Sequence, residues 1–395
     1  MKPTKHIVLV AGKRTAFGSF GGSLKDITAT DLAVACSKAA LESIGATGAV
    51  IDAAFFGNVC QTQQDAIYLA RHIALKSGAG EQVPALTLNR LCGSGFEAIA
   101  QAAAAIELGE AEVCLAGGTE SMSQAPHIVR GARWGFPLGQ APKMEDSLWS
   151  SLTDTMTGMA MANTAEKVGR TWNITRQDCD DLALMSQQRY TAALAAGVYD
   201  AEIAPITVQT RKGPVEIKKD EHPKPDTTME GLQKLKAVFE KDGMVTAGNA
   251  SGIVDGAAAI IVTTAERAKK EGWPVLATFV ASAAVGCDPT MMGIGPVPAI
   301  RKVLADTGMT IEQIDVFDIN EAFAAQYLGV EKELGLDRAK SNIHGGAVAL
   351  GHPLGASGTR ITLHLALELA KRGSGYAIGS ACIGGGQGMA ILLKK

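Results

Sequence analysis

Short apolar runs rich in β-branched residues alternate with longer, alanine-rich stretches over the first 118 residues of the chain. Runs of the first kind are typical of buried strands, and stretches of the second kind are typical of helices. The predicted elements are Ile7–Ala11, Asp31–Ser43, Ile51–Val59, Ala66–Lys76, Ala85–Asn89, Phe96–Leu108 and Val113–Ala116. The same alternation resumes after Gly252, so the pattern predicts an α/β fold with helices layered against sheet.

The segment from Thr119 to Asn249 breaks this pattern. It carries more charge and more proline, including the polar run Lys218–Asp226, and its periodicity is helical with few strand signals. We therefore expect a subdomain inserted into the first half. The predicted domains are an N-terminal half (1–118 plus about 252–272), an inserted loop subdomain (119–251) and a C-terminal half (273–395).

The C-terminal half repeats features of the N-terminal half at a constant separation of 263 residues. Six identical pairs share this register: Leu41/Leu304, Gly45/Gly308, Ile51/Ile314, Asp52/Asp315, Ser94/Ser357 and Gly95/Gly358. They fall at equivalent places, namely a helix end, a turn, a strand start and a Ser-Gly pair that opens the next helix. Any two α/β units can share such matches, so the identities alone leave the relationship open.

Composition and charge restrict the function classes. With 395 residues, 47% of them apolar, the chain can bury a large core. The formal net charge of −3 gives no general attraction to nucleic acid or an anionic membrane, and no run of about 18 apolar residues predicts a membrane span. The seven cysteines contain no C-x-x-C pair, so neither a disulfide framework nor a metal site is expected. Because no secretory signal precedes the first strand, we expect a cytoplasmic protein, with the mitochondrial matrix as the alternative in a eukaryote.

The first candidate for chemistry is Cys92, in the motif Asn89–Phe96 (N-R-L-C-G-S-G-F), where a predicted strand turns into a predicted helix. Backbone N–H groups and the helix dipole at such a place stabilise a thiolate, so we expect a lowered pKa and a reactive sulfur. A lone cysteine is more often a small buried apolar residue, and this is the interpretation preferred for Cys36 and Cys114.

The corresponding place in the second half holds Gly345–Gly358 (G-G-A-V-A-L-G-H-P-L-G-A-S-G), with His352 just before a predicted helix Thr359–Lys371. If the halves pack about a pseudo-twofold axis, two helix N-termini converge and bring His352 near Cys92 as a base beside a nucleophile. A lone histidine in a turn is usually solvated or a cap, so this pairing depends on the repeat.

Two more motifs offer groups that could stabilise a negative oxygen. In Ser380–Met389 (S-A-C-I-G-G-G-Q-G-M), the glycines could present N–H groups as an oxyanion hole, with Cys382 beside them for proton transfer. Alone, the glycine triplet would be read as a tight hairpin. In Asn320–Ala324 (N-E-A-F-A), the Asn320 amide could hold a water or an oxygen, although a helix N-cap is the simpler interpretation.

Together, the motifs C-G-S-G, N-E-A-F-A, G-H-P-L-G-A-S-G and C-I-G-G-G-Q-G, in this order, make the chain resemble the thiolase family over essentially its whole length. Gly117–Ser123 and Val245–Gly256 add further matches. The resemblance implies an α/β thiolase fold with two layered αβαβα halves related by a pseudo-twofold axis. It also implies that the inserted loop subdomain binds coenzyme A and makes oligomer contacts, and that the protein is a homotetramer, a dimer of dimers. The segment Gly131–Trp149 offers apolar side chains for such contacts: Trp134, Phe136, Leu138 and Trp149.

The same resemblance implies roles for individual residues. Cys92 would accept the acyl group, His352 would activate it, and Cys382 would transfer the α-carbon proton. His352 and a water held by Asn320 would bind the thioester oxygen of one reactant. The N–H groups of Cys92 and Gly384 would bind the oxyanion of the acyl-enzyme. The expected reaction is reversible acyl transfer between 3-ketoacyl-CoA plus CoA and acyl-CoA plus acetyl-CoA, with coenzyme A as a substrate and no cofactor or metal.

The substrate contacts implied by the resemblance are Ser251, Met161, Met292, Phe323, Lys224 and Ala247. Ser251 matches the family's pantetheine contact. Thiolases specialised for acetoacetyl-CoA carry a His-Met pair over the acyl pocket, whereas this chain has Ala160-Met161 and is more similar to mitochondrial-type 3-ketoacyl-CoA thiolases. We therefore expect broad use of short to medium acyl chains, with a biosynthetic thiolase narrow for four carbons as the alternative. A second departure is His344, where the family usually has Asn.

Other functions are distinguished by their motifs. A β-ketoacyl synthase pairs its cysteine with two histidines, and neither it nor a hydroxymethylglutaryl-CoA synthase is expected to show C-I-G-G-G-Q-G. A nicotinamide-dependent dehydrogenase would carry G-x-G-x-x-G after its first strand, which this chain lacks. A lipid-binding relative that has lost its chemistry would keep the fold. The presence of all four catalytic positions favours an enzyme.

Overall fold

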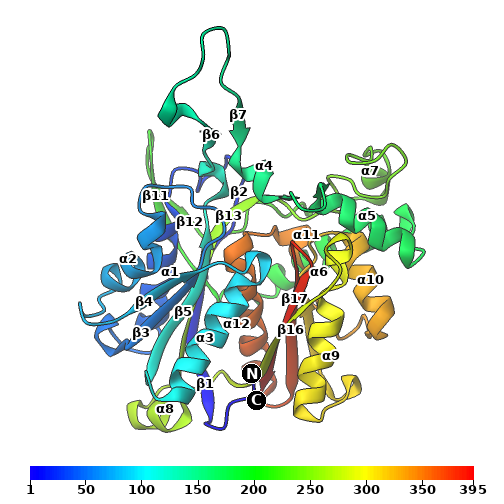
Figure 1. Ribbon diagram of the computed structural model, residues 1–395. Coiled ribbons are helices and arrows are strands. Elements are labelled where there is room, and N and C mark those ends of the chain that lie inside the picture. Colours follow the sequence, from blue (N-terminus) through cyan, green and yellow to red (C-terminus); the bar gives the residue numbers. More distant parts are fainter.

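The computed structural model describes residues 1–395 and contains two α/β halves that lie side by side (Figure 1). In the N-terminal half the strand order is β1 (Ile7–Thr15), β13 (Val254–Thr264), β5 (Val113–Glu120), β3 (Ala53–Gly57) and β4 (Ala85–Leu88). In the C-terminal half it is β14 (Ala277–Gly286), β17 (Gln387–Lys394), β16 (Tyr376–Ile383) and β15 (Val316–Ile319). Both sheets run antiparallel over their first three strands and then parallel. Pairing of β1 with β14 joins these nine strands, and the short strands β2 (Gly18–Ser19) and β10 (Ile203–Ala204) pair with β13 and β1 to complete a sheet of 11 strands.

Helices form one layer between the two sheets and one on each outer face (Figure 1). The middle layer holds α3 (Ser94–Leu108) and α12 (Leu354–Arg372). The outer layer of the N-terminal half holds α1 (Ala29–Glu42), α2 (Leu69–Lys76) and α8 (Ala265–Glu271). The outer layer of the C-terminal half holds α9 (Pro296–Thr307) and α10 (Ala324–Leu334). The largest apolar clusters fill the spaces between these layers. This arrangement confirms the predicted layered α/β fold.

The separation of 263 residues seen in the sequence recurs in the structure. Strands β5 and β16 are related by it at both ends, as are the 3-10 turns η1 (Gly48–Val50) and η7 (Ile311–Gln313). Gly45 and Gly308, which follow α1 and α9, have φ values of 66° and 70°, a left-handed conformation that glycine adopts without strain. The two halves therefore repeat the same succession of elements.

The central helices α3 and α12 touch at glycines that are equivalent in the repeat. A Cβ atom added to Gly95 would lie 2.4 Å from the backbone N of Thr359, and one added to Gly358 would lie 2.4 Å from the backbone N of Phe96. Phe96 and Thr359 are themselves related by the same separation of 263 residues. The pseudo-twofold axis thus passes between the first turn of α3 and the second turn of α12, which only glycine allows to come so close.

Some predicted boundaries differ from the observed ones. Helix α12 begins at Leu354 instead of Thr359, because packing on the sheet stabilises a first turn that its glycines disfavour in isolation. Strand β1 continues to Thr15 and β5 to Glu120, past their predicted ends at Ala11 and Ala116. These extensions carry the strands up to the region where the candidate residues lie.

The inserted segment contains more strand than the sequence predicted. Its elements are β6 (His127–Val129), β7 (Met144–Asp146), α4 (Ser147–Ser151), β8 (Thr153–Asp154), β9 (Met159–Ala160), α5 (Met161–Thr171), α6 (Arg176–Ala195), β10 (Ile203–Ala204), β11 (Ile206–Thr210), β12 (Gly213–Ile217) and α7 (Met229–Gln233). Strands of two to five residues are too short to show an alternating pattern, which explains the miss. The β6–β7 hairpin extends away from the body of the molecule (Figure 1). Outside the insertion, β2 (Gly18–Ser19) and α11 (Ala347–Leu350) complete the fold, and no helix combines the length and apolarity needed to cross a membrane.

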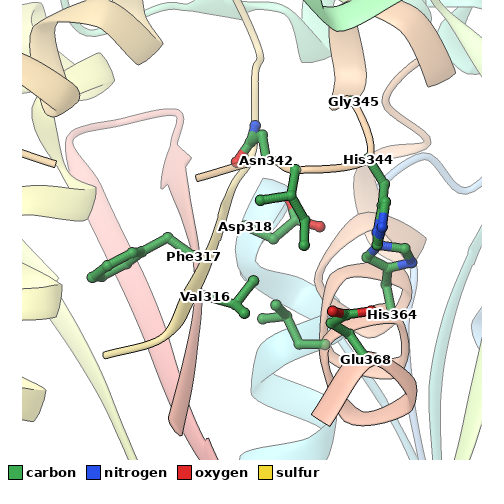
Figure 2. Close-up of a pocket in the computed structure, with 10 residues that line it drawn as sticks. Val316, Phe317, Asp318, Asn342, His344, Gly345, His364 and Glu368 are labelled. Carbon is green, nitrogen blue, oxygen red and sulfur yellow. The ribbon is translucent and has the colours of Figure 1, made fainter. Parts of the chain in front are cut away.

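The unusual His344 contacts a second histidine, His364 of α12, at the edge of a small surface pocket (Figure 2). Nδ1 of His344 lies 2.9 Å from Nε2 of His364. The backbone carbonyl of His344 also accepts a hydrogen bond of 2.6 Å from the Tyr199 hydroxyl. Burial, with the charge of His364 as the second cause, lowers the pKa of His344 to about 4.

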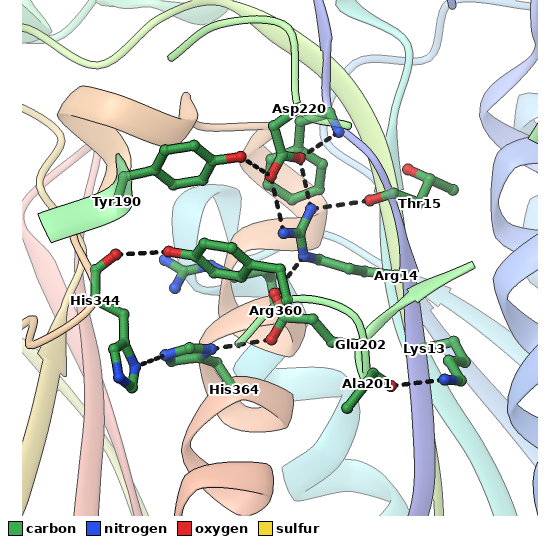
Figure 3. A network of polar contacts seen from close by, with 12 residues as sticks. Lys13, Arg14, Thr15, Tyr190, Ala201, Glu202, Asp220, His344, Arg360 and His364 are labelled. Carbon is green, nitrogen blue, oxygen red and sulfur yellow. Dashed lines mark hydrogen bonds and ion pairs between the residues drawn. The ribbon is translucent and has the colours of Figure 1, made fainter. Parts of the chain in front are cut away.

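Beyond His364, a buried network of charges connects the insertion to both halves (Figure 3). His364 Nδ1 lies 2.9 Å from Glu202, and Glu202 and Asp220 both pair with the fully buried Arg14 of β1 at 2.6 Å. Burial acts to raise the pKa of Glu202, but the charges of Arg14 and His364 outweigh it and lower this pKa to about 2. Tyr190 of α6 donates to Asp220 at 3.0 Å. Strand β1, α6, α12 and the segment around Asp220 are thereby held together.

We predict that His344 makes the fold sensitive to acid. The pKa of His344 in the folded chain is about 4, below the ordinary value of 6.5, so between these pH values the unfolded chain binds a proton at His344 that the folded chain does not. The free energy of unfolding that the neutral His344 contributes is therefore fully present above pH 6.5 and is lost as the pH falls towards 4. His344→Asn should therefore have a melting temperature that declines less steeply than that of the wild type between pH 7 and pH 4.5. Differential scanning fluorimetry measures this, with the exposed His6→Asn as the matched control. Parallel curves for all three proteins would contradict the prediction.

Candidate active site

Cys92 lies in a short 3-10 turn, η3 (Leu91–Gly93), that leads directly into the central helix α3. The preceding Leu91 has φ of 47°, a left-handed conformation that costs a leucine on the order of 1 kcal/mol. The Leu91 N–H donates to Oδ1 of Asn89 at 2.8 Å, which helps to hold this turn. The structure therefore places the half-buried Cys92 at the helix N-terminus, as the sequence predicted.

The expected lowering of the Cys92 pKa is wrong. Burial raises the pKa of this thiol to about 11; N–H groups of Gly384 and of Cys92 itself act in the opposite direction, and the negative charge of Glu120 adds to the increase. The loss of hydration outweighs the helix terminus, because a buried thiolate keeps only a few hydrogen bonds. At neutral pH the resting sulfur is a protonated thiol, so a base has to remove its proton during the reaction.

His352 lies on the segment between α11 and α12 and is almost fully buried. Its Nδ1 is 2.6 Å from the hydroxyl oxygen of Ser357, and this hydroxyl donates in turn to the carbonyl of Pro353 at 3.1 Å. The Ser357 oxygen therefore accepts from Nδ1–H, which leaves the lone pair of the neutral imidazole on Nε2. Burial, with the charge of Arg360 as the second cause, lowers the His352 pKa to about 3. His352 thus rests as a neutral base.

Asn320 follows the end of strand β15 and is fully buried. Its Nδ2 lies 3.3 Å from Nε2 of His352, while its Oδ1 has no hydrogen-bond partner in the protein. An unpaired buried acceptor is costly, so Oδ1 of Asn320 favours binding of a water or of a ligand group that donates a hydrogen bond. Asn320 and His352 therefore form one polar corner, as the sequence predicted from separate motifs.

Cys382 lies on strand β16, two residues before Gly384, and is buried. Burial and the proximity of Cys92 raise its pKa well above the ordinary value for a thiol, so it rests as a proton carrier. Its side chain packs in an apolar cluster with Met292 and Ala322, against which Met161 and Phe323 also lie. Two thiols and the Gly384 N–H are thus gathered near the ends of α3 and β16.

An apolar cleft of about 630 Å³ opens onto His352. Its lining residues are Met122, Trp149, Leu152, Ala160, Met161, Ala162, Phe239, Ala250, Ser251, Gly252, Ile253, Phe323, His352 and Leu354. Most of the walls come from the inserted segment and from the loop that follows it. Trp149 and Phe239 stack with ring centroids 6.2 Å apart. Trp149 was expected among the oligomer contacts, but the structure places it on this cleft.

Of the six predicted substrate contacts, Ser251, Met161 and Phe323 line the cleft. Met292 is buried beside Cys382, next to Met161 and Phe323. Ala247 and Lys224 are exposed and lie outside the lining residues, and the Lys224 N–H donates to Gln187. The structure brings four of these positions together around the candidate site and leaves two on the surface.

Several residues that shape the site were not found from the sequence. Ser357 was noted only as part of the repeat, although it orients His352. Glu120, inside the matched motif Gly117–Ser123, binds backbone N–H groups of both halves. Glu321 of N-E-A-F-A accepts from Ser186 and Asn342 and so holds the loop beside Asn320. A glutamate inside a matched apolar motif was the signal available for both, because a buried carboxylate needs specific partners.

Comparison with known proteins identifies the family. The model of the thiolase N-terminal domain matches residues 7–266, and that of the thiolase C-terminal domain matches residues 273–395. The chain is 53% identical over 391 residues to the human mitochondrial 3-ketoacyl-CoA thiolase, covering 99% of this chain and 98% of that protein. It is 46% identical to an acetyl-CoA acetyltransferase of Pseudomonas aeruginosa, over 99% of this chain and all of that one. The crystal structure of the human mitochondrial enzyme superposes with a TM-score of 0.97 over 99% of both chains.

The fold and the comparisons define an enzyme of the acyltransferase class. The chain belongs to the thiolase family.

We predict that Ser357 sets the orientation of His352. Ser357→Ala leaves the buried Nδ1–H without an acceptor, so thiolase kcat should fall by about 10-fold to 100-fold with little change in KM. Ser357→Thr keeps the hydroxyl and should recover much of the loss. Steady-state kinetics of the three proteins, with circular dichroism to confirm folding, provide the measurement. Equal activity of the alanine variant and the wild type would contradict the proposed orientation.

Proposed function

We propose that this thiolase catalyses reversible acyl transfer between 3-ketoacyl-CoA plus CoA and acyl-CoA plus acetyl-CoA, through an acyl group on Cys92. The observation that carries the proposal is that His352 lines an apolar cleft whose walls contact both thiols. Cys92 packs against the cluster that contains the lining residues Met122 and Leu354, and Cys382 lies in the cluster against which Met161 and Phe323 pack. The proposed reaction needs all three groups. Cys92 is the nucleophile, His352 is the base that removes its proton, and Cys382 exchanges a proton with the α-carbon of acetyl-CoA.

In the first half-reaction, Nε2 of His352 takes the Sγ proton of Cys92 as the sulfur attacks the keto carbon of the substrate. The carbon–carbon bond then breaks, and its electrons form the enolate of acetyl-CoA. Cys382 protonates the α-carbon of this enolate and becomes a thiolate. The products are acetyl-CoA and an acyl thioester on Cys92, with one proton stored on His352.

In the second half-reaction, the thiol of coenzyme A attacks the acyl thioester. The Cys382 thiolate takes the proton of this thiol, and the leaving Cys92 sulfur recovers the proton from His352. The exchange of one thioester for another is nearly balanced in free energy, so the same steps run backwards as a condensation. Direction is then set by the supply of substrates.

Two separate groups of donors would stabilise negative oxygen. The corner formed by Asn320 and His352 would bind the thioester oxygen of the enolate, with a water on the Asn320 amide. The N–H groups of Cys92 and Gly384, which already lie against the sulfur, would bind the oxygen of the acyl-enzyme. Donors fixed in a water-poor site stabilise such charges strongly, because they need no reorganisation.

Coenzyme A is proposed as the substrate of this cleft, with its pantetheine arm along Ser251 and Phe323. A structural relative that is 52% identical, the human mitochondrial 3-ketoacyl-CoA thiolase, has been solved in complex with CoA, which supports this assignment. Lys224 and Ala247 stay proposed contacts on the surface beyond the cleft.

We propose a cytoplasmic enzyme, with the mitochondrial matrix as the alternative.

A homotetramer built as a dimer of dimers is proposed on the basis of the β6–β7 hairpin. This extension exposes apolar side chains that a monomer would leave in water, including Trp134, Phe136 and Leu138. Exposed apolar patches of this kind are typical of protein contacts. Light scattering of the wild type, compared with a Trp134→Ser variant, tests the assembly.

For the acyl group we propose short to medium chains. The cleft walls are mainly apolar, and Ala160 leaves room beside Met161. The purified enzyme should therefore cleave 3-ketohexanoyl-CoA and 3-ketooctanoyl-CoA as well as acetoacetyl-CoA, as measured with free CoA in a series of chain lengths. Cleavage of acetoacetyl-CoA alone would favour the narrow biosynthetic alternative.

We predict that the two thiols can be separated by their half-reactions. Cys92→Ala should abolish cleavage and leave no acyl-enzyme. Cys382→Ala should also lose carbon–carbon bond cleavage, by more than about 100-fold, because the enolate has no proton donor. Its Cys92 should still become acetylated by acetyl-CoA, although more slowly, because no α-carbon proton moves in this step and the coenzyme A thiolate can leave without a proton from Cys382. Intact-protein mass spectrometry after mixing with acetyl-CoA distinguishes the two variants. Full cleavage activity in Cys382→Ala would overturn the assignment.

A further inference from the structure

Glu120 is the last residue of β5, and its carboxylate is fully buried. It takes no part in the acyl-transfer steps described above. It lies where three segments meet: the end of β5, the loop after β3 and the first turn of α12. The first two of these segments belong to the N-terminal half, and the third begins two residues after His352. A buried carboxylate is costly unless all of its lone pairs are paired, so its partners indicate what it holds.

All partners of Glu120 are neutral N–H groups. Oε1 accepts from Nδ2 of Asn58 at 2.9 Å and from the backbone of Cys60 at 2.8 Å. Oε2 accepts from the backbone of Val59 at 3.1 Å and from that of Gly355 at 2.8 Å. A single side chain thus binds the loop of one half and the helix start of the other.

The junction around Glu120 has no spare volume. A Cβ atom added to Gly355 would lie 2.8 Å from the carbonyl oxygen of Gly57 and 2.9 Å from Oε2 of Glu120. One added to Gly118 would lie 1.8 Å from the carbonyl oxygen of Gly355. The first turn of α12 therefore sits directly on the ends of β3 and β5, and its position relative to the N-terminal half is transmitted to His352 through Pro353 and Leu354.

Glu120 also acts on Cys92 through its charge. Glu120 accepts from the backbone N–H of Cys60, and Cys60 belongs to the apolar cluster against which Cys92 packs. Burial is the main cause of the raised Cys92 pKa, and the negative charge of Glu120 adds to it. Burial raises the pKa of Glu120 itself to about 7, against the lowering effect of the Cys60, Gly355 and Val59 N–H groups. The carboxylate thus favours the protonated thiol at Cys92 while it fixes the segment that carries the base.

We propose that Glu120 is a positioning residue of the thiolase reaction, which holds the His352 segment against the N-terminal half and places a buried negative charge near the Cys92 thiol. This inference rests on the proposed function for its catalytic consequence. Its effect on Cys92 is independent of any acyl-CoA.

The test is Glu120→Gln in the full-length enzyme. In one orientation the amide NH₂ group faces the N–H groups of Val59 and Gly355, and in the other it faces Nδ2 of Asn58 and the N–H of Cys60. Either way one pair of donors loses its acceptor, so the junction between the loop after β3 and the start of α12 should loosen. We expect kcat to fall by about 10-fold to 100-fold with KM for CoA within about 3-fold of the wild type. We also expect alkylation of Cys92 by iodoacetamide, followed by mass spectrometry of its peptide, to move to lower pH. Loosening of the fold would also expose the thiol, because burial is the main cause of its raised pKa, so the alkylation profile is compared with that of a variant that loses an equally buried carboxylate elsewhere.

Glu166→Gln is the matched control, because Glu166 is equally buried and accepts from the backbone of Met244 at 3.0 Å and Val245 at 2.8 Å, outside the cleft lining. It should leave the alkylation profile of Cys92 unchanged. The proposal is overturned if Glu120→Gln keeps its kcat within about 2-fold of the wild type, if its alkylation profile does not move, or if Glu166→Gln moves it equally.

If Glu120→Gln does not fold, Glu120→Asp retains the charge but is too short to reach every donor. It should lower kcat and leave the alkylation profile in place, and an unchanged kcat would overturn the proposal. Failure of the proposed function is separate: a wild type that cleaves no 3-ketoacyl-CoA would still show the alkylation difference between Glu120→Gln and Glu166→Gln.

Discussion

The close contact of two glycines, Gly95 on α3 and Gly358 on α12, is the constraint on which the site depends. Helices normally pack with their axes 8–10 Å apart because side chains separate them. Here the backbones touch at the first turn of α3 and the second turn of α12, where an added Cβ would lie 2.4 Å from a backbone nitrogen of the opposite helix. This contact brings together the N-terminal ends of both helices. The segments that carry Cys92 and His352 are thereby fixed by two buried helices and not by mobile loops.

Burial determines the resting state of the site. It raises the pKa of both Cys92 and Cys382 and lowers the pKa of His352, so each group is neutral when no substrate is bound. A charge costs too much in this environment to exist alone. Proton transfer and bond formation are therefore coupled in the proposed reaction, and the N–H groups around Cys92 act mainly when an oxyanion forms. The same reasoning explains why Glu120 needs its full set of N–H partners.

The repeat positions the site, and departures from the repeat give it function. By the separation of 263 residues, Cys92 corresponds to Gly355 and His352 to Asn89, so the nucleophile and the base are not equivalent residues. Asn320 corresponds to Gly57, where an added Cβ would collide with Ser94. Each half therefore contributes different chemistry from the same element ends. The insertion supplies most of the cleft walls, and the Arg14 network anchors it to both halves.

The sequence by itself determined the α/β class and the thiolase family and suggested the repeat, because hydrophobic periodicity and the order of the motifs can be read along the chain without knowing its contacts. It also named Cys92, His352, Cys382 and Asn320, whose roles stay predictions. The tertiary structure alone decided the rest. The sign of the Cys92 pKa shift depends on burial, the role of Ser357 depends on a contact with an imidazole, and the lining of the cleft depends on which segments of the insertion fold back. Hydration, contact and enclosure arise only when distant segments meet, so no pattern along the chain could reveal them.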